Sequence, residues 1–215
     1  MIYYDILDDR RRALLPGFAF LKNKEFYLAG GTGLTLQIGH RDSVDFDFFR
    51  KEPFNTERLL EEVKQAFIGH ALLTTQEAEN TLSIVIDDAV LVSLFSYPYP
   101  LIGQLIDTEC FSIASLEDIG CMKLSAIAGR ATLKDYVDIY YILKVISLNE
   151  LLKKIKIKMP TLDTPLLLKS LVYFDDLHDE PLMFKHGHEI DLETIKKNLT
   201  EQVATYTKRE LGFQN

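Results

Sequence analysis

Apolar and polar positions follow two different periods along this chain, and the change between them falls near residue 114. In the first half, short apolar runs and polar–apolar alternation are typical of buried and half-buried strands. Amphipathic helical patterns, with apolar residues three or four positions apart, precede and separate these strands. The expected helices cover residues 4–23 and 56–67, and the expected strands cover residues 26–29, 43–49, 71–75, 81–86, 90–95 and 110–113.

From residue 115 onward the pattern is helical only. The expected helices begin at Leu116 and Thr132, with further helices over residues 147–157, 164–174 and 191–210. A run of strands followed by a run of helices is typical of the α+β class. We therefore predict an α+β protein in which residues 1–114 form a mixed β-sheet with flanking helices and residues 115–215 form a helical C-terminal lobe.

Residues 26–49 combine a strand, a turn, a helix and a second strand in one unit. The first strand stops at Gly30 and Gly31, which are typical of a tight turn. Thr32 is expected to cap the short helix that follows. Residues 43–49 then alternate between polar and apolar positions, as a half-buried strand does.

That alternation brings two carboxylates together. Val44, Phe46 and Phe48 are expected on one face of the strand. Asp45 and Asp47 then share the other face, separated by about 7 Å of backbone, and could hold two hard cations about 4 Å apart for in-line phosphoryl displacement. Backbone amides of the glycine turn could bind a triphosphate at the helix start. Either half alone suits an ordinary turn or a solvated strand face, but both halves in one unit favour a nucleotide site.

The spacing between the glycine pair and the two aspartates is similar to that of the polymerase-beta-like nucleotidyltransferase superfamily. The longer segment AGGTGLTLQIGHRDSVDFDFF resembles the AbiEii/AbiGii toxin family within it. The resemblance implies a nucleotidyltransferase core over residues 1–114, which moves a nucleoside monophosphate from an NTP to an acceptor and releases pyrophosphate. It implies that Asp45 and Asp47 hold Mg²⁺ (or Mn²⁺). Gly30, Gly31 and Thr32 would cradle the β- and γ-phosphates.

The superfamily also carries a third carboxylate on a later strand. Here Ser93, in the segment VLVSLFS, stands at the aligned position. A hydroxyl is a poorer ligand for Mg²⁺ than a carboxylate. Asp87 and Asp88 could contribute from the expected hairpin, although both suit its turn. The number of metal ions therefore stays open.

A second group of charged residues lies on helix faces of the second half. Lys123 falls among the apolar positions of its helix, and Asp135 and Asp138 fall on the packed face of the next helix. A lysine buried in this way needs an anion or a polar cleft for its ammonium. Thr132 with Asp135 would form a capping box. Lys123 with Asp138 would form a structural salt bridge between adjacent helices.

The family resemblance adds a functional interpretation to these charges. It extends to a Lys…Arg…Lys-Asp-x-x-Asp segment, here KLSAIAGRATLKDYVDIYYIL. It implies that Lys123 contacts a nucleotide phosphate, with Arg41 or Arg130 adding cationic stabilisation. Asp135 or Asp138 would serve the acceptor as a base, and the choice between them stays open.

Composition and charge restrict the class of protein. The chain has 215 residues, of which 47% are hydrophobic and 26% charged, and its net charge is −8. That charge argues against tight nonspecific nucleic-acid binding, which needs many contacts from Lys and Arg to phosphate. A local cluster contains Lys153, Lys154, Lys156 and Lys158, for which a solvated helix end is the favoured interpretation. No apolar run reaches the length of a membrane span, so we expect no membrane partner and a cytoplasmic location.

The resemblance further implies the toxin of a toxin–antitoxin pair, with an antitoxin protein as partner and RNA, such as tRNA, as acceptor. Two alternatives stay open. The first is a catalytically silent member that binds nucleotide or a partner protein, which Ser93 favours and NTP turnover would exclude. The second is a small-molecule nucleotidyltransferase of the antibiotic-modifying kind, which an acidic cleft matching cationic sugars would favour.

Overall fold

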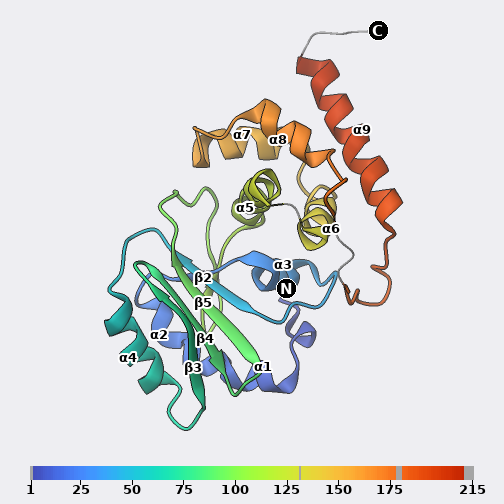
Figure 1. Ribbon diagram of the computed structural model, residues 1–215. Helices are drawn as coiled ribbons and strands as arrows, with labels where there is room; N and C mark the ends of the chain where they lie inside the picture. The colour runs from blue at the N-terminus through green and yellow to red at the C-terminus, as the bar shows by residue number, and fades with distance from the viewer. Residues whose placement is uncertain (1, 131, 178–180, 211–215) are drawn as a thin grey trace. The chain divides into compact units, whose positions relative to one another are not determined.

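The structure is a computed structural model that describes residues 2–130, 132–177 and 181–210 (Figure 1). It divides into two compact units, Met1–Ser115 and Leu116–Asn215. The first unit holds a mixed sheet with helices, and the regular elements described in the second unit are helices. The predicted α+β class is therefore confirmed.

The sheet of the first unit has seven strands: β1 (Tyr27–Leu28), β2 (Phe46–Arg50), β3 (Leu72–Ala78), β4 (Thr81–Ile86), β5 (Val90–Ser96), β6 (Ile106–Asp107) and β7 (Ser112–Ile113). Their order is β3-β4-β5-β2-β1-β7-β6. β2 runs parallel to β5 and β1 runs parallel to β7, while the other neighbours are antiparallel. This order places β2, which carries the aspartate pattern, in the centre of the sheet.

One face of the sheet packs against helices through a cluster of aromatic rings. Phe46 and Phe48 of β2 are fully buried, and the ring centroid of Phe18 lies 4.9 Å and 5.1 Å from theirs. Phe67 follows helix α4 (Thr56–Ala66) and packs edge-on against Phe18 at 5.2 Å. Burial of such large side chains is a main source of stability. Because successive side chains alternate along a strand, this cluster turns the intervening residues of β2 toward the other face.

The single helix predicted over residues 4–23 is wrong, because the segment forms four short helical pieces. They are η1 (Tyr4–Ile6), α1 (Asp9–Leu14), η2 (Leu15–Phe18) and α2 (Ala19–Lys22). Pro16 has no N–H with which to continue the hydrogen bonds of α1. Gly17 lies so close to Phe67 that a Cβ at this position would overlap the ring. The segment therefore breaks where it meets the aromatic cluster.

The second unit contains α5 (Leu116–Gly129), α6 (Leu133–Ile142), α7 (Leu148–Lys158), α8 (Thr164–Leu171) and α9 (Leu192–Glu210). Helix α5 is its central element and contacts α6, α7 and α8 (Figure 1). Helix α9 packs against α6, α7 and α8. Across the described part of both units, no helix combines the length and apolar character needed to cross a membrane.

A fully buried ion pair joins α5 to α7. Lys158 Nζ lies 2.7 Å from Asp118 Oδ1, and neither side chain has exposed surface. The interpretation of Lys158 as part of a solvated cluster is therefore wrong. Burial of two charges is costly and persists only where they are close and well bonded. The pair thus fixes α7 against α5 and offers no charge to solvent.

Lys158→Met is expected to destabilise the protein by about 3 to 5 kcal/mol, because Asp118 would stay buried without its cation. The measurement is urea denaturation, with Lys156→Met on the exposed side of α7 as the matched control. The double variant Lys158→Met/Asp118→Leu should recover most of the loss, since no buried charge remains. Equal stability of Lys158→Met and the unchanged protein would contradict the structural role of the pair.

Candidate functional site

The connection between β1 and β2 is a helix, α3 (Gly30–Ile38), which starts directly at the glycine pair. Its cap residue is Ala29, and Gly33 N–H donates the first helical hydrogen bond to Ala29 O at 2.9 Å. The predicted cap at Thr32 is therefore wrong, because Thr32 already lies inside the first turn. The backbone amides of the first three helical residues precede this bond and lie at the positive end of the helix dipole.

Gly30 packs directly against Asp47 of β2. Its φ is 61°, and a Cβ at this position would lie 2.7 Å from Asp47 Oδ2. The neighbouring Ala29 N–H donates to Asp47 O at 3.0 Å, which holds the strand against the helix start. A side chain at position 30 would be strained and would displace the carboxylate. Glycine is required here because the helix N-terminus comes so close to the aspartate.

Gly31 allows a similar approach to Arg41. A Cβ on Gly31 would lie 2.9 Å from Arg41 Nη2 and 2.8 Å from Ser43 Oγ. Arg41 is buried, and its Nη1 donates to Asp42 O at 2.8 Å. Arg130, the other arginine considered, is exposed just after α5. Within the first unit the structure therefore brings Arg41 to the start of α3.

The hydroxyl of Thr32 contacts the residues that immediately precede β2. Thr32 is 1% exposed, and its Oγ1 donates to the main-chain oxygen of Asp45. The same atom lies 2.9 Å from Ser43 Oγ. Ser43 was missed by the sequence interpretation, and its signal was a small hydroxyl residue in the polar loop before the strand. Because the Thr32 hydroxyl is bonded to the main chain before β2, a ligand at the helix start would meet the backbone N–H of Thr32 and not its hydroxyl.

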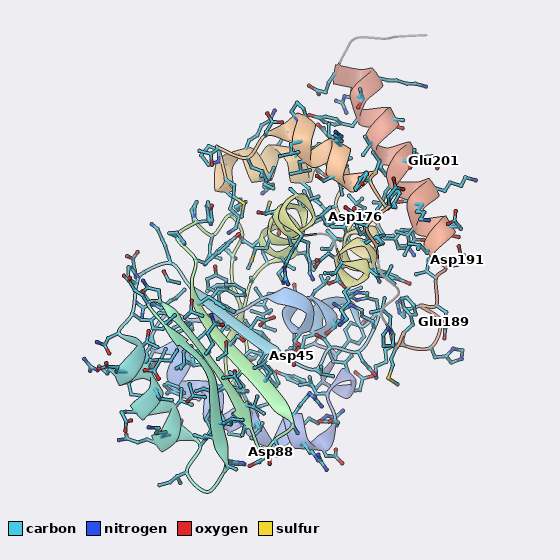
Figure 2. All side chains as sticks on the ribbon, in the orientation of Figure 1. Asp45, Asp88, Asp176, Glu189, Asp191 and Glu201 are labelled. Atoms are coloured by element: carbon cyan, nitrogen blue, oxygen red, sulfur yellow. The ribbon has the colours of Figure 1, made fainter. Side chains whose placement is uncertain are left out.

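Asp45 and Asp47 are both half-buried near the start of β2. Asp47 lies inside the strand, while Asp45 immediately precedes it. Figure 2 shows Asp45 at the end of β2 that lies near α3. The carboxylate of Asp47 lies at the amide-bearing end of α3, and the main chain of Asp45 is bonded to the first turn of that helix.

The strand predicted over residues 43–49 begins late, at Phe46. The main-chain oxygen of Val44 accepts from Arg11 Nε at 2.7 Å, and the next carbonyl accepts from Thr32. These carbonyls are bonded by side chains, so the chain pairs with its neighbours only from Phe46 onward. Val44 is consequently 50% exposed, and its predicted place on the buried face is wrong.

Ser93, which the resemblance aligns with the third carboxylate, pairs with Asp47 across β5 and β2. It is 5% exposed, and its hydroxyl lies 3.2 Å from Ser83 Oγ on β4. Asp87, in the hairpin between β4 and β5, is bonded to His70 Nδ1 at 2.7 Å, which lowers the pKa of Asp87. In the part of the chain that the structure describes, no three His, Cys, Asp or Glu side chains gather as a metal site.

Two carboxylates still suit Mg²⁺. This ion usually takes one or two protein carboxylates and completes its shell with waters and substrate phosphates. Asp45 and Asp47 supply that donor set beside the helix start. Asp87 and Asp88 have φ values of 52° and 54°, which a tight hairpin turn requires. Asp88 precedes Ser93 by about 16 Å of strand, so the turn does not supply a third ligand.

The second unit holds a buried lysine between two aspartates. Lys123 Nζ lies 2.8 Å from Asp135 Oδ1 and 2.6 Å from Asp138 Oδ2. Burial by itself disfavours the ammonium, but the charges of Asp138 and Asp135 outweigh it and raise the pKa of Lys123 above its ordinary 10.5. The expected salt bridge to Asp138 is present, and it is shared with Asp135.

Asp135 also belongs to the cap of α6. Thr132 is the cap residue, and its Oγ1 lies 2.9 Å from Asp135 Oδ2 and 3.4 Å from Asp135 N. The side chain of Asp135 is 8% exposed and that of Asp138 is fully buried. Both aspartates therefore have structural roles, and Asp135 is the more accessible of the two.

The lysine cluster on α7 is smaller than its sequence indicates. Lys153 and Lys156 are exposed and Lys154 is half-buried. Lys158 pairs with Asp118 in the interior. Three of the four cations therefore remain available to a partner at the surface.

Residues 14–83 match the family described as "Nucleotidyl transferase AbiEii toxin, Type IV TA system". An uncharacterised protein of Aquifex aeolicus (strain VF5), aq_aa25, is 36% identical over 162 residues, which cover 73% of this chain and 77% of that protein. The structure of MenT4, a nucleotidyltransferase toxin of Mycobacterium tuberculosis H37Rv, has a TM-score of 0.63 and 13% identity, covering 91% of this chain and 82% of that one. A structure from H. pylori, provisionally described as a nucleotidyltransferase, has a TM-score of 0.61 and 20% identity, covering 97% and 100%. At these identities the solved structures support the fold.

Lys123→Met is expected to lower the free energy of unfolding by about 3 kcal/mol or more, because two carboxylates lose their shared cation. Since the folded-state pKa of Lys123 is raised, its stabilisation is present below pH 10.5 and is lost as the pH rises through the folded pKa. The Met variant should lack that alkaline loss. Urea denaturation at pH 7 and above pH 10.5 tests both points, with exposed Lys169→Met as control. Unchanged stability together with lost nucleotide affinity would make Lys123 a ligand contact instead.

Proposed function

Because this chain belongs to the AbiEii family of nucleotidyl transferase toxins, we propose that it transfers a nucleoside monophosphate from an NTP to an RNA acceptor, as the toxin of a toxin–antitoxin pair. Nucleotidyl transfer is the activity of the family to which this chain belongs. The acceptor, the metal and the toxin role are our proposal. The observation that supports it is the close approach of Gly30 to Asp47, which sets a helix N-terminus, the kind of helix end that suits phosphate, beside a carboxylate.

The start of α3 would bind the triphosphate. The amides of Gly30, Gly31 and Thr32 precede the first helical bond, and the helix dipole favours negative charge there. Arg41 lies against Gly31 and would add a guanidinium, whose planar fork matches phosphate oxygens. Close backbone approach is possible because two successive residues lack side chains.

Asp45 and Asp47 would hold Mg²⁺, or Mn²⁺, with their carboxylate oxygens. When bound, the ion neutralises phosphate charge and orients the attacking oxygen. The start of α3 holds the main chain that carries the two carboxylates. Ala29 N–H bonds the main chain of Asp47, and the Thr32 hydroxyl bonds that of Asp45. Such positioning is the main contribution of the protein in phosphoryl transfer.

The buried charges of the second unit would contribute to the reaction through Lys123. An ammonium has three donors, and Asp135 and Asp138 take two of them. The third could donate to a nucleotide phosphate, with the exposed Arg130 as an additional cation. Asp135 is the better candidate for the base that serves the acceptor, because Asp138 is fully buried.

An RNA acceptor is supported by the exposed cations of α7. Lys153 and Lys156 are exposed and Lys154 is half-buried along one helix. They could contact successive phosphates of a strand although the whole protein carries a charge of −8. An antitoxin as the counterpart of this protein is supported by the family description, which names a type IV toxin–antitoxin system.

A catalytically silent member that binds nucleotide or a partner protein is a second candidate function. It is favoured by Ser93, which stands beside Asp47 where a third carboxylate would lie. Measurable transfer from any labelled NTP to RNA would exclude it. Nucleotide binding without transfer, in the presence of Mg²⁺ and total RNA, would support it.

The double variant Asp45→Asn/Asp47→Asn is expected to lower transfer more than about 100-fold and to remove Mg²⁺-dependent NTP binding, because both metal ligands lose their charge. Stability should be equal or higher, since mutual repulsion is relieved. Transfer and binding are measured with each labelled NTP. Asp87→Asn/Asp88→Asn, in the hairpin turn, is the matched control. Unchanged binding and transfer in the first variant would refute the assignment.

Replacing Lys153 and Lys156 by Glu is expected to weaken RNA labelling while NTP binding is retained. The slope of labelling against salt concentration, on logarithmic scales, should fall by about one to two, because about one to two phosphate contacts are lost. The control is Lys51→Glu/Lys64→Glu, which changes the net charge equally at exposed positions of the first unit. Labelling is measured across a series of salt concentrations. Equal labelling in both double variants, or label transferred to a protein or small molecule, would contradict an RNA acceptor at α7.

A further inference from the structure

A cavity lies in the first unit, at the end of β2 away from the two aspartates. Its volume is about 260 Å³, and its charged and polar lining consists of Lys24, Arg50, Asn55, Arg58 and Glu62. Three of these side chains are cations and one is an acid, so the cavity has two positive charges in excess.

Arg50, the last residue of β2, has an N–H with no acceptor. Its guanidinium carbon lies 5.4 Å from the ring centre of Phe26, which is itself buried. Its Nε is buried and has no hydrogen-bond partner among the described residues. A buried donor on a charged group costs free energy unless an acceptor is present. Arg50 therefore lines the cavity with a cation whose hydrogen-bonding capacity the described residues leave unfilled.

The other two cations share one carboxylate. Lys24 Nζ lies 2.7 Å from Glu62 Oε2, and Arg58 Nε lies 3.4 Å from Glu62 Oε1. Glu62 therefore neutralises at most one of them and leaves donors on both. Asn55 caps α4 by accepting from Arg58 N at 2.7 Å, so the positive end of this helix dipole also lies at the cavity.

We propose that this cavity binds a phosphate group and is separate from the nucleotide site. The fork of a guanidinium matches phosphate oxygens, and the adjacent ammonium supplies a further charge-assisted bond. The volume is below the roughly 300 to 1,000 Å³ of typical ligand pockets, which favours one phosphate group over a whole nucleotide. Three residues of β2, about 10 Å, separate Arg50 from Asp47. The phosphate comes either from a free ion or from a nucleic-acid backbone.

Thermal unfolding in the presence of inorganic phosphate, without divalent metal, tests the site. Phosphate that binds the folded protein raises its melting temperature. The phosphate concentration that gives half of the maximal rise reports the affinity. Arg50→Met is expected to raise that concentration at least about tenfold, because a charge-assisted hydrogen bond is lost. Arg50→Lys should give an intermediate value, since the charge is kept and the fork is lost. Lys51→Met, an exposed neighbour, should behave as the unchanged protein.

A second arm identifies the source of the phosphate. Binding of a single-stranded RNA oligonucleotide is measured by fluorescence anisotropy across salt concentrations, again without divalent metal. A salt slope that falls by about one in Arg50→Met indicates a backbone phosphate. An unchanged slope with weakened inorganic phosphate binding indicates a free ion. If Arg50→Met fails to fold, Arg58→Met replaces it in both arms. Equal affinities of the cavity variant and Lys51→Met for both probes would overturn the proposal.

Discussion

The contact between Gly30 and Asp47 is the constraint on which the site in the first unit depends. A Cβ at position 30 would lie 2.7 Å from the carboxylate, so the helix can start here only with a residue that has no side chain. That approach is held by a main-chain bond from Ala29 to Asp47. It places the positive end of α3 against an acid on the central strand of the sheet. A phosphate and its counter-ion can be bound at such a point by backbone and carboxylate together.

The aromatic cluster on the opposite face of the sheet makes this contact possible. Phe46 and Phe48 alternate with the aspartates along β2, and both are fully buried against Phe18. Moving β2 by one residue would turn the phenylalanines out and the carboxylates into the core. The large apolar area that the rings bury therefore fixes the side of the sheet on which the acids lie. The register with β5 then sets Ser93 beside Asp47.

Buried charge plays the corresponding part in the second unit. Lys158 pairs with Asp118, and Lys123 is shared between Asp135 and Asp138. Each cation joins two helices, so the central helix α5 is fixed to α7 by one pair and to α6 by the other. Such pairs contribute little net stability but penalise any arrangement that separates the partners. The proposed phosphate contact of Lys123 would use the third donor of its ammonium, beside the two that the aspartates take.

The sequence by itself determined the α+β class, the order of most elements and the grouping of Gly30, Gly31, Asp45 and Asp47, because these follow from local periodicity and turn chemistry. It also indicated a buried role for Lys123. Tertiary structure decided the start of β2, since Arg11, distant in the sequence, bonds the carbonyl of Val44. It likewise decided that Lys158 is buried, because its partner lies 40 positions away on another helix. A charge pattern shows which residues need a partner, but the packing of helices decides whether that partner is an internal carboxylate or a ligand.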